Sequence, residues 1–194
     1  MILSSEAQIK EYTDKGWWGT ETILDLFLRN VENSPDAMAI VDPPNRATFT
    51  SGEPIRYTYA EAQRATANLA SALRDAGVEK DDIVMVQLPN IVELALVYLA
   101  ASYVGAIVSP VPVQYRTYDL KRVMTLTEPK VYITTVNFGD FNYVEMAQKL
   151  QAEFPSLETI IAVGEELPEG VVSLSDILNR EAAADIEVME EVLD

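Results

Sequence analysis

The sequence predicts an α/β protein with three layers, α/β/α, in which a mainly parallel sheet follows an N-terminal β-hairpin. The first indication is the order strand, helix, strand over residues 83–111, with short joins. The second is that this alternation continues to residue 163, and three successive crossovers require parallel strands with helices on both faces. The third is composition, because 194 residues with 48% hydrophobic content can bury a substantial core.

The centre of the predicted fold is a helix over residues 90–103. Asn90 is placed to cap its first turn, with Glu93 to reach back, and Gly105 can end it in the left-handed conformation. Its apolar side chains, Leu94 among them, point in every direction, and Glu93 is its one charge. A helix that is apolar all round is buried, so we expect the sheet on one side and another part of the protein on the other.

Two further helices are predicted before this unit. Thr22 is expected to cap a helix that runs to Asn33. The pattern Thr58-Tyr-Ala-Glu61 is a capping box, and it opens a helix that reaches Ala76.

Residues 37–41 and 55–59 favour two antiparallel strands, which form the N-terminal hairpin. The loop between them contains residues 48–53, which have one glycine and no lysine. A phosphate-binding loop needs several converging backbone N–H groups and a lysine or a helix start, so we expect a surface turn here.

After residue 111, Thr117 is placed to cap a helix, and the alternation of strands and helices continues. The predicted elements are a helix to residue 127, a strand over 130–135, a helix over 140–154, a strand over 157–163, a Pro/Gly loop over 164–170 and a short helix from Ser175.

The chain divides into three predicted parts. Residues 1–19 include Trp17 and Trp18, which are costly to leave in water, so we expect this segment to dock onto the body, with ligand stacking as the alternative. Residues 20–180 form the α/β lobe. Residues 181–194 hold six acids and no base and are predicted to be an acidic linker.

Composition excludes several functions. The chain has no histidine and no cysteine, so Ser-His or Cys-His catalysis, a disulfide framework and a typical zinc site cannot be built from it. A net charge of −17 opposes binding to nucleic acid and to anionic membranes. We find no transmembrane span and no signal peptide, and we expect a cytoplasmic protein.

Several short motifs, in this order, resemble the N-terminal lobe of AMP-forming acyl- and aryl-CoA synthetases, members of the adenylate-forming superfamily. The resemblance covers residues 17–165. Lys15-Gly-Trp-Trp-Gly19 is similar to the branch that activates aryl acids such as 2,3-dihydroxybenzoate. The other motifs are Tyr57-Thr-Tyr-Ala-Glu-Ala62, Leu69-Ala-Ser-Ala-Leu73, Gly77-Val78, Asp82-Ile-Val-Met-Val-Gln-Leu-Pro-Asn90 and Gly105-Ala106-Ile107.

The resemblance implies a parent enzyme that uses Mg-ATP to convert a carboxylic acid into an acyl-adenylate and then passes the acyl group to a thiol such as coenzyme A. The family's phosphate loop, adenine motif, ribose-binding Asp and catalytic Lys lie downstream of this sequence. We therefore carry over no catalytic residue and no metal ligand. We expect the fragment to be inactive alone and to bind none of these cofactors, and the gene to continue past Asp194.

Two residues are candidates for ligand contacts. In the family, the loop after the second parallel strand reads Asn-Pro before an Arg-, Thr- or Tyr-bearing stretch, and here that place reads Pro112-Val-Gln-Tyr115-Arg116. The resemblance implies Arg116 as a contact to a CoA phosphate and Tyr115 as part of the acyl-pocket wall. The alternatives are a surface arginine beside Asp119 and a core tyrosine.

A second class of function remains open, a self-contained flavodoxin-like binding or interaction module. Such folds bind ligands at the carboxyl ends of the strands, and here those ends lack glycine, which disfavours this alternative. We also expect homo-oligomers, formed through apolar surface exposed on the helix over residues 90–103. The sequence does not indicate which acid is used, or whether the acceptor is CoA or a carrier-protein thiol.

Overall fold

The computed structural model describes residues 4–181 and contains the predicted parallel sheet. The sheet has five strands in the order β4-β3-β5-β8-β9, all paired in parallel. Numbered along the chain from β3, this order is 2-1-3-4-5, which is the flavodoxin-like doubly wound order. The strands are β3 (Ile83–Gln87), β4 (Ile107–Pro110), β5 (Val131–Thr135), β8 (Thr159–Val163) and β9 (Val171–Ser173).

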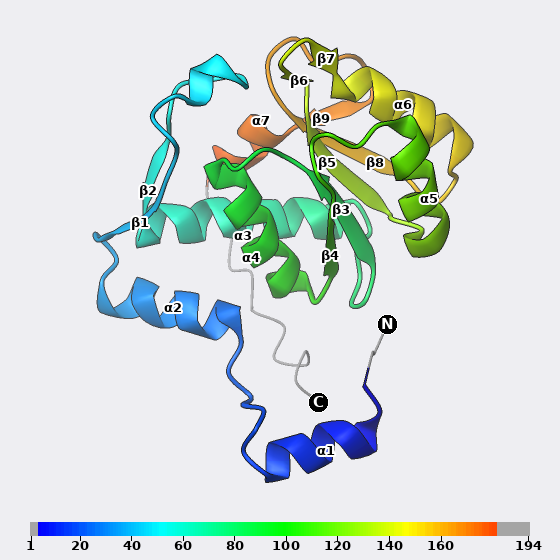
Figure 1. Ribbon diagram of the computed structural model, residues 1–194. Coiled ribbons are helices and arrows are strands. Elements are labelled where there is room, and N and C mark those ends of the chain that lie inside the picture. The colour runs from blue at the N-terminus through cyan, green and yellow to red at the C-terminus, as the bar shows by residue number, and fades with distance from the viewer. Residues whose placement is uncertain (1–3, 182–194) are drawn as a thin grey trace.

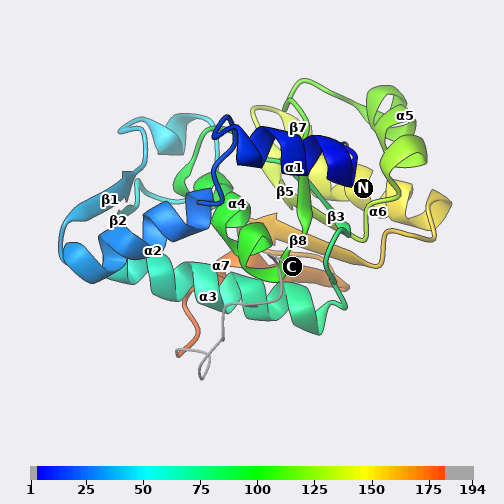
Figure 2. The same ribbon diagram turned by 90° about the horizontal axis from the view of Figure 1, so that it is seen from below.

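Helices cover both faces of this sheet, as Figure 1 shows from one side and Figure 2 from below. On one face, α3 (Tyr59–Asp75) lies beside α4 (Val92–Val104) and α7 (Leu174–Leu178), and α2 (Ile23–Asn33) packs outside α3 and α4. On the other face lie α5 (Thr117–Thr127) and α6 (Tyr143–Glu153). Each face therefore has its own apolar core, and the sheet separates them.

Two small antiparallel pairs flank the main sheet. The predicted hairpin is formed by β1 (Met38–Val41) and β2 (Arg56–Thr58), with a short 3₁₀ helix, η1 (Arg46–Thr48), in the loop between them. A second pair, β6 (Asn137–Phe138) and β7 (Phe141–Asn142), follows β5 and was not predicted. The strand β9 was also missed, because it falls between the predicted loop over 164–170 and the predicted helix from Ser175.

The helix caps show which local signals were correct. Thr22 and Thr58 form the predicted capping boxes, with Asp25 and Glu61 respectively. The prediction for Asn90 was wrong: helix α4 is preceded by Ile91, whose side chain does not cap it. The N–H of Val92 instead donates to Asp42 Oδ1 at 2.8 Å, so a residue 50 positions away supplies the cap.

The predicted starts of two later helices were also wrong. Thr117 was predicted as a cap but is the first helical residue of α5, with Arg116 before it. Helix α6 begins at Tyr143, after a cap by Asn142, which accepts a hydrogen bond from the N–H of Glu145 at 2.8 Å.

The central helix α4 is covered by the sheet and α3, and only part of its outer side is open. Leu96 and Val97 are fully buried against the sheet and α3. Leu94 is half-buried, and Tyr98 is 42% exposed between α4 and α2. Tyr98 is the one large apolar side chain of α4 that is exposed, so the open apolar surface of this helix is smaller than the sequence predicts.

The N-terminal helix α1 (Glu6–Asp14) stands apart from the α/β body in Figure 1 and has no buried residue. Trp17 and Trp18 pack around Tyr12, with ring centroids 5.4 and 5.1 Å away, and remain 66% and 41% exposed. Residues 4–19 thus do not show the burial expected of an anchor on this lobe. Apart from Glu181, the predicted acidic linker lies outside the described residues.

Within residues 4–181, no helix combines the length and the apolar character needed to cross a bilayer.

Candidate functional site

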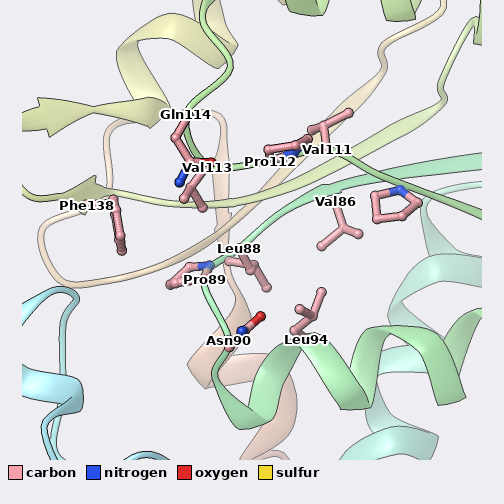
Figure 3. Close-up of a pocket in the computed structure, with 11 residues that line it drawn as sticks. Val86, Leu88, Pro89, Asn90, Leu94, Val111, Pro112, Val113, Gln114 and Phe138 are labelled. Atoms are coloured by element: carbon pink, nitrogen blue, oxygen red, sulfur yellow. The ribbon is translucent and has the colours of Figure 1, made fainter.

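A hollow of about 470 Å³ lies at the carboxyl edge of the parallel sheet (Figure 3). The chain leaves β3 toward α4 and leaves β5 toward α6, which cover opposite faces of the sheet, so the hollow lies at the topological switch point. In open α/β sheets this is where ligands bind. The residues that line the hollow are Val86, Leu88, Pro89, Asn90, Leu94, Pro110, Val111, Pro112, Val113, Gln114 and Phe138.

The lining is apolar because of the segments that form it. Leu88 continues the buried pattern of β3, and Pro89, which has no N–H, ends the strand ladder. The N–H of Ile91 then donates to the carbonyl of Pro89 at 2.8 Å, and this tight turn directs the chain into α4. As Figure 3 shows, Leu88 and Leu94 lie on one side of the hollow and Val113 and Phe138 lie across from them.

A buried polar pair supports the loop that follows β4. Gln87 is fully buried, and its Nε2 donates to the carbonyls of Pro112 at 2.7 Å and Tyr115 at 3.2 Å. The hydroxyl of Tyr132 donates to Gln87 Oε1. Burial raises the pKa of Tyr132, so the hydroxyl remains a donor at every physiological pH. The loop that lines one wall of the hollow is thereby fixed to β3 and β5.

Arg116, the candidate for a CoA phosphate, follows this loop in the chain and is not one of the residues that line the hollow. Its guanidinium lies 4.1 Å from the centroid of the Phe141 ring and 5.2 Å from that of Tyr143. Its Nη1 donates to the carbonyl of Val113 at 2.6 Å and to that of Tyr115 at 2.9 Å. These hydrogen bonds hold the backbone of the loop in place. A contact between Arg116 and CoA remains a prediction.

Tyr115, the candidate for the acyl-pocket wall, is 38% exposed and is not one of the residues that line the hollow. Its backbone carbonyl, rather than its ring, is what Gln87 and Arg116 hold. Asp119 accepts from the backbone N–H of Arg116 at 3.3 Å, so the expected neighbour is present but bonds the main chain.

Beside the hollow lies a cluster that the sequence analysis missed, the ion triad of Asp42, Arg46 and Glu93, which are 4%, 2% and 2% exposed. Arg46 Nη1 and Nη2 donate to the two carboxylate oxygens of Glu93 at 2.9 and 2.5 Å. Nη1 also donates to Asp42 Oδ2 at 2.6 Å. The loop over residues 42–54 is thus fastened to the start of α4 and is more than a surface turn.

These contacts stabilise the positive charge of Arg46. Burial alone would lower the pKa of the Arg46 guanidinium, but the hydrogen bonds that it donates to Glu93 and Asp42 outweigh this effect and raise the pKa above its usual value. Both carboxylate oxygens of Asp42 also accept backbone hydrogen bonds. Oδ1 accepts from the N–H of Val92, and Oδ2 accepts from the N–H of Ile55 at 2.9 Å. A guanidinium is the cation best suited to such a site, because its planar fork matches two carboxylates.

This arrangement can hold an apolar group but offers little for phosphate chemistry. No charged side chain lines the hollow, so it suits the hydrocarbon or aromatic part of a ligand. Residues 48–53 carry no lysine and do not begin a helix, so this loop does not fit the phosphates of ATP. Over residues 4–181 no three Asp or Glu side chains gather closely enough to hold a metal ion.

The fold and the hollow define a doubly wound α/β lobe with an apolar hollow at its switch point. Comparison with known proteins gives the family. The profile of the AMP-binding enzymes matches residues 27–188, so the chain belongs to that family, as its motifs predicted.

The curated relatives include acid-activating ligases of two kinds. The chain is 27% identical over 175 residues to the medium-chain fatty-acid–CoA ligase of Escherichia coli, covering 90% of this chain and 29% of the ligase. It is 29% identical over 154 residues to the 2,3-dihydroxybenzoate-AMP ligase of Bacillus subtilis, covering 79% of this chain and 27% of that enzyme. The chain therefore spans less than a third of the length of these relatives.

A solved structure agrees. The acetoacetyl-CoA synthetase of Streptomyces lividans superposes with a TM-score of 0.71 and 26% identity, over 82% of this chain and 25% of the synthetase. This chain thus corresponds to the N-terminal part of adenylate-forming enzymes.

Proposed function

We propose that this chain is the N-terminal lobe of an AMP-forming carboxylic acid–CoA ligase and supplies its framework and part of its acyl pocket. The parent protein would use ATP and Mg²⁺ to form an acyl-adenylate and would then transfer the acyl group to CoA. The chain would be inactive alone, because the loop over residues 48–53 does not fit the phosphates of ATP and the family's phosphate loop and catalytic Lys are expected downstream.

One observation carries this proposal: an apolar hollow at the switch point of a chain that belongs to the AMP-binding family. Its volume of about 470 Å³ falls within the range of small-molecule sites, about 300–1,000 Å³. An uncharged wall favours the acyl or aryl part of the acid over its carboxylate, which would lie toward the downstream part of the protein. Tyr115 and Arg116 remain proposed contacts to the acyl group and to a CoA phosphate.

We further propose a cytoplasmic protein that serves fatty-acid or aryl-acid metabolism. The likeness to the E. coli and B. subtilis ligases supports this reading. We also propose homo-oligomers, because Ile23, Leu26 and Tyr98 are 74%, 38% and 42% exposed around one groove between α2 and α4. The proposed domain limits are residues 1–19, 20–180 and 181–194.

The test is acid-dependent exchange of pyrophosphate into ATP by the full-length gene product, measured with a panel of aryl, medium-chain and long-chain acids. We expect exchange with at least one acid, followed by release of AMP when CoA is added. The chain of 194 residues should show neither. If the full-length product exchanges with no acid, the ligase proposal fails and a flavodoxin-like binding module becomes the better account.

A further inference from the structure

The ion triad is more than a stabilising contact. Removing charged side chains from water costs several kcal/mol per ion, and apolar residues of similar volume often stabilise a protein at least as well. Asp42, Arg46 and Glu93 are nevertheless at most 4% exposed. Buried ionic groups are retained in some proteins because they select one conformation. The hydrogen bonds of Arg46 identify the conformation that is selected here.

Arg46 fixes both ends of a short segment against α4. Its Nη1 and Nη2 bind Glu93 at the first turn of α4, while its Nε donates to the carbonyl of Ser51 at 3.1 Å. Residues 46–51 are therefore closed into a loop around one guanidinium. Because the fork is rigid, the distance between this loop and α4 is set by the length of these bonds.

The closed loop in turn touches a wall of the hollow. The Phe49 ring packs on the Phe138 ring, with centroids 6.0 Å apart and planes at 60°. The hydroxyl of Thr50 lies 3.1 Å from that of Thr135, the last residue of β5. Phe138 lines the hollow, whereas the triad does not. A continuous chain of contacts thus runs from Arg46 through Phe49 to Phe138.

We propose that Arg46 is a positioning residue. Through Phe49 it fixes the position of Phe138, which forms one wall of the hollow, and it thereby determines which carboxylic acids fit the hollow. This inference rests on the proposed acyl pocket. A lysine at position 46 keeps the positive charge but cannot bind both carboxylates and the Ser51 carbonyl at once. The wall would then lose its fixed position, and acids that contact Phe138 would bind more weakly.

The first test uses the full-length protein and acid-dependent pyrophosphate exchange. We expect Arg46→Lys to raise KM for the preferred acid about tenfold and to leave KM for ATP within about twofold, since an error of about 1 Å in position can cost up to about 100-fold. Phe49→Ala, which leaves the triad intact, should have a similar effect. Arg29→Lys is the matched control, because Arg29 pairs with Glu21 on the surface.

The double variant decides whether Arg46 acts through Phe49. If it does, adding Arg46→Lys to Phe49→Ala should change KM for the acid by less than about twofold, because residues in one contact chain are not additive. Independent, multiplying effects would overturn the proposal. Equal increases in KM for the acid and for ATP would also overturn it, because they indicate a general loss of structure.

A second readout does not depend on activity. Amide hydrogen exchange over residues 135–142 should become about tenfold faster in Arg46→Lys of the full-length protein, while exchange in α3 stays unchanged. Unchanged exchange over residues 135–142 would refute the positioning role whatever the enzyme does. Faster exchange in a protein that activates no acid would refute the proposed function instead and leave the coupling of Arg46 to the wall intact.

Discussion

Replacing Arg46 with methionine is expected to be strongly destabilising, because it leaves two carboxylates buried without their cation. The side chains of Asp42 and Glu93 are 0% and 2% exposed. Breaking a buried pair by removing one partner costs about 3–5 kcal/mol. That is a large part of the roughly 5–15 kcal/mol that stabilises a typical domain. For a protein of this size, about 2–4 °C per kcal/mol predicts a fall in Tm of roughly 6–20 °C.

The assay is thermal unfolding followed by circular dichroism, with Arg29→Met as the matched control. The Arg29–Glu21 pair is 57% and 50% exposed, so its loss should cost less than about 1 kcal/mol. Adding Glu93→Gln to Arg46→Met should recover part of the loss, because it removes one of the unpaired charges. If Arg46→Met is no more destabilising than the control, the triad is not buried and paired as described.

Three further predictions concern the frame around the site. Leu96→Ala should lower the free energy of unfolding by about 2–5 kcal/mol in urea titration, since Leu96 is fully buried; a loss below about 1 kcal/mol would contradict this. Hydrogen bonds from Thr58 hold the pKa of Glu61 below its usual 4.5. In urea titrations across pH 2–6, the protein should therefore be more stable than Glu61→Gln above pH 4.5, and this difference should disappear as the pH falls through the lowered pKa. A difference that does not change with pH would contradict this prediction. Gly164→Ala should destabilise in the same assay, because its Cβ would lie 2.5 Å from Val136 Cγ2, and an unchanged midpoint would argue against so close an approach.

Much of the fold was predictable because its signals are local. The capping boxes at Thr22 and Thr58, and the apolar runs that became β3, β5 and β8, each depend on residues within a few positions of one another. The parallel sheet with helices on both faces followed from the rule that parallel strands need crossovers.

The failures share a physical cause, which is dependence on distant partners. The cap of α4 comes from Asp42, so no pattern near Asn90 could reveal it. Strand β9 has three residues and exists because β8 offers it an edge to pair with. The strands β6 and β7 have two residues each, which is too short to show a periodic pattern in the sequence.

The candidate site was predictable in place but not in its residues. The rule for switch points gives the carboxyl edge of the sheet, where the hollow lies. The resemblance singled out Tyr115 and Arg116, whereas Leu94 and Phe138 form the walls. Arg46 could not be found, since Glu93 lies 47 positions away and an arginine in a loop is usually exposed.

The most direct test of the account is to fill the hollow and measure which acids the full-length protein activates. Leu94→Trp places a larger ring among the lining residues, while Tyr98→Trp changes the same helix outside them. We expect Leu94→Trp to raise KM in pyrophosphate exchange by about tenfold or more for bulky acids but by less than about threefold for the shortest acid, since overfilling an apolar pocket costs about 1–3 kcal/mol. Tyr98→Trp should leave the acid preference unchanged. If Leu94→Trp shows the same acid preference as the unsubstituted full-length protein across all acids, the hollow is not part of the acyl pocket.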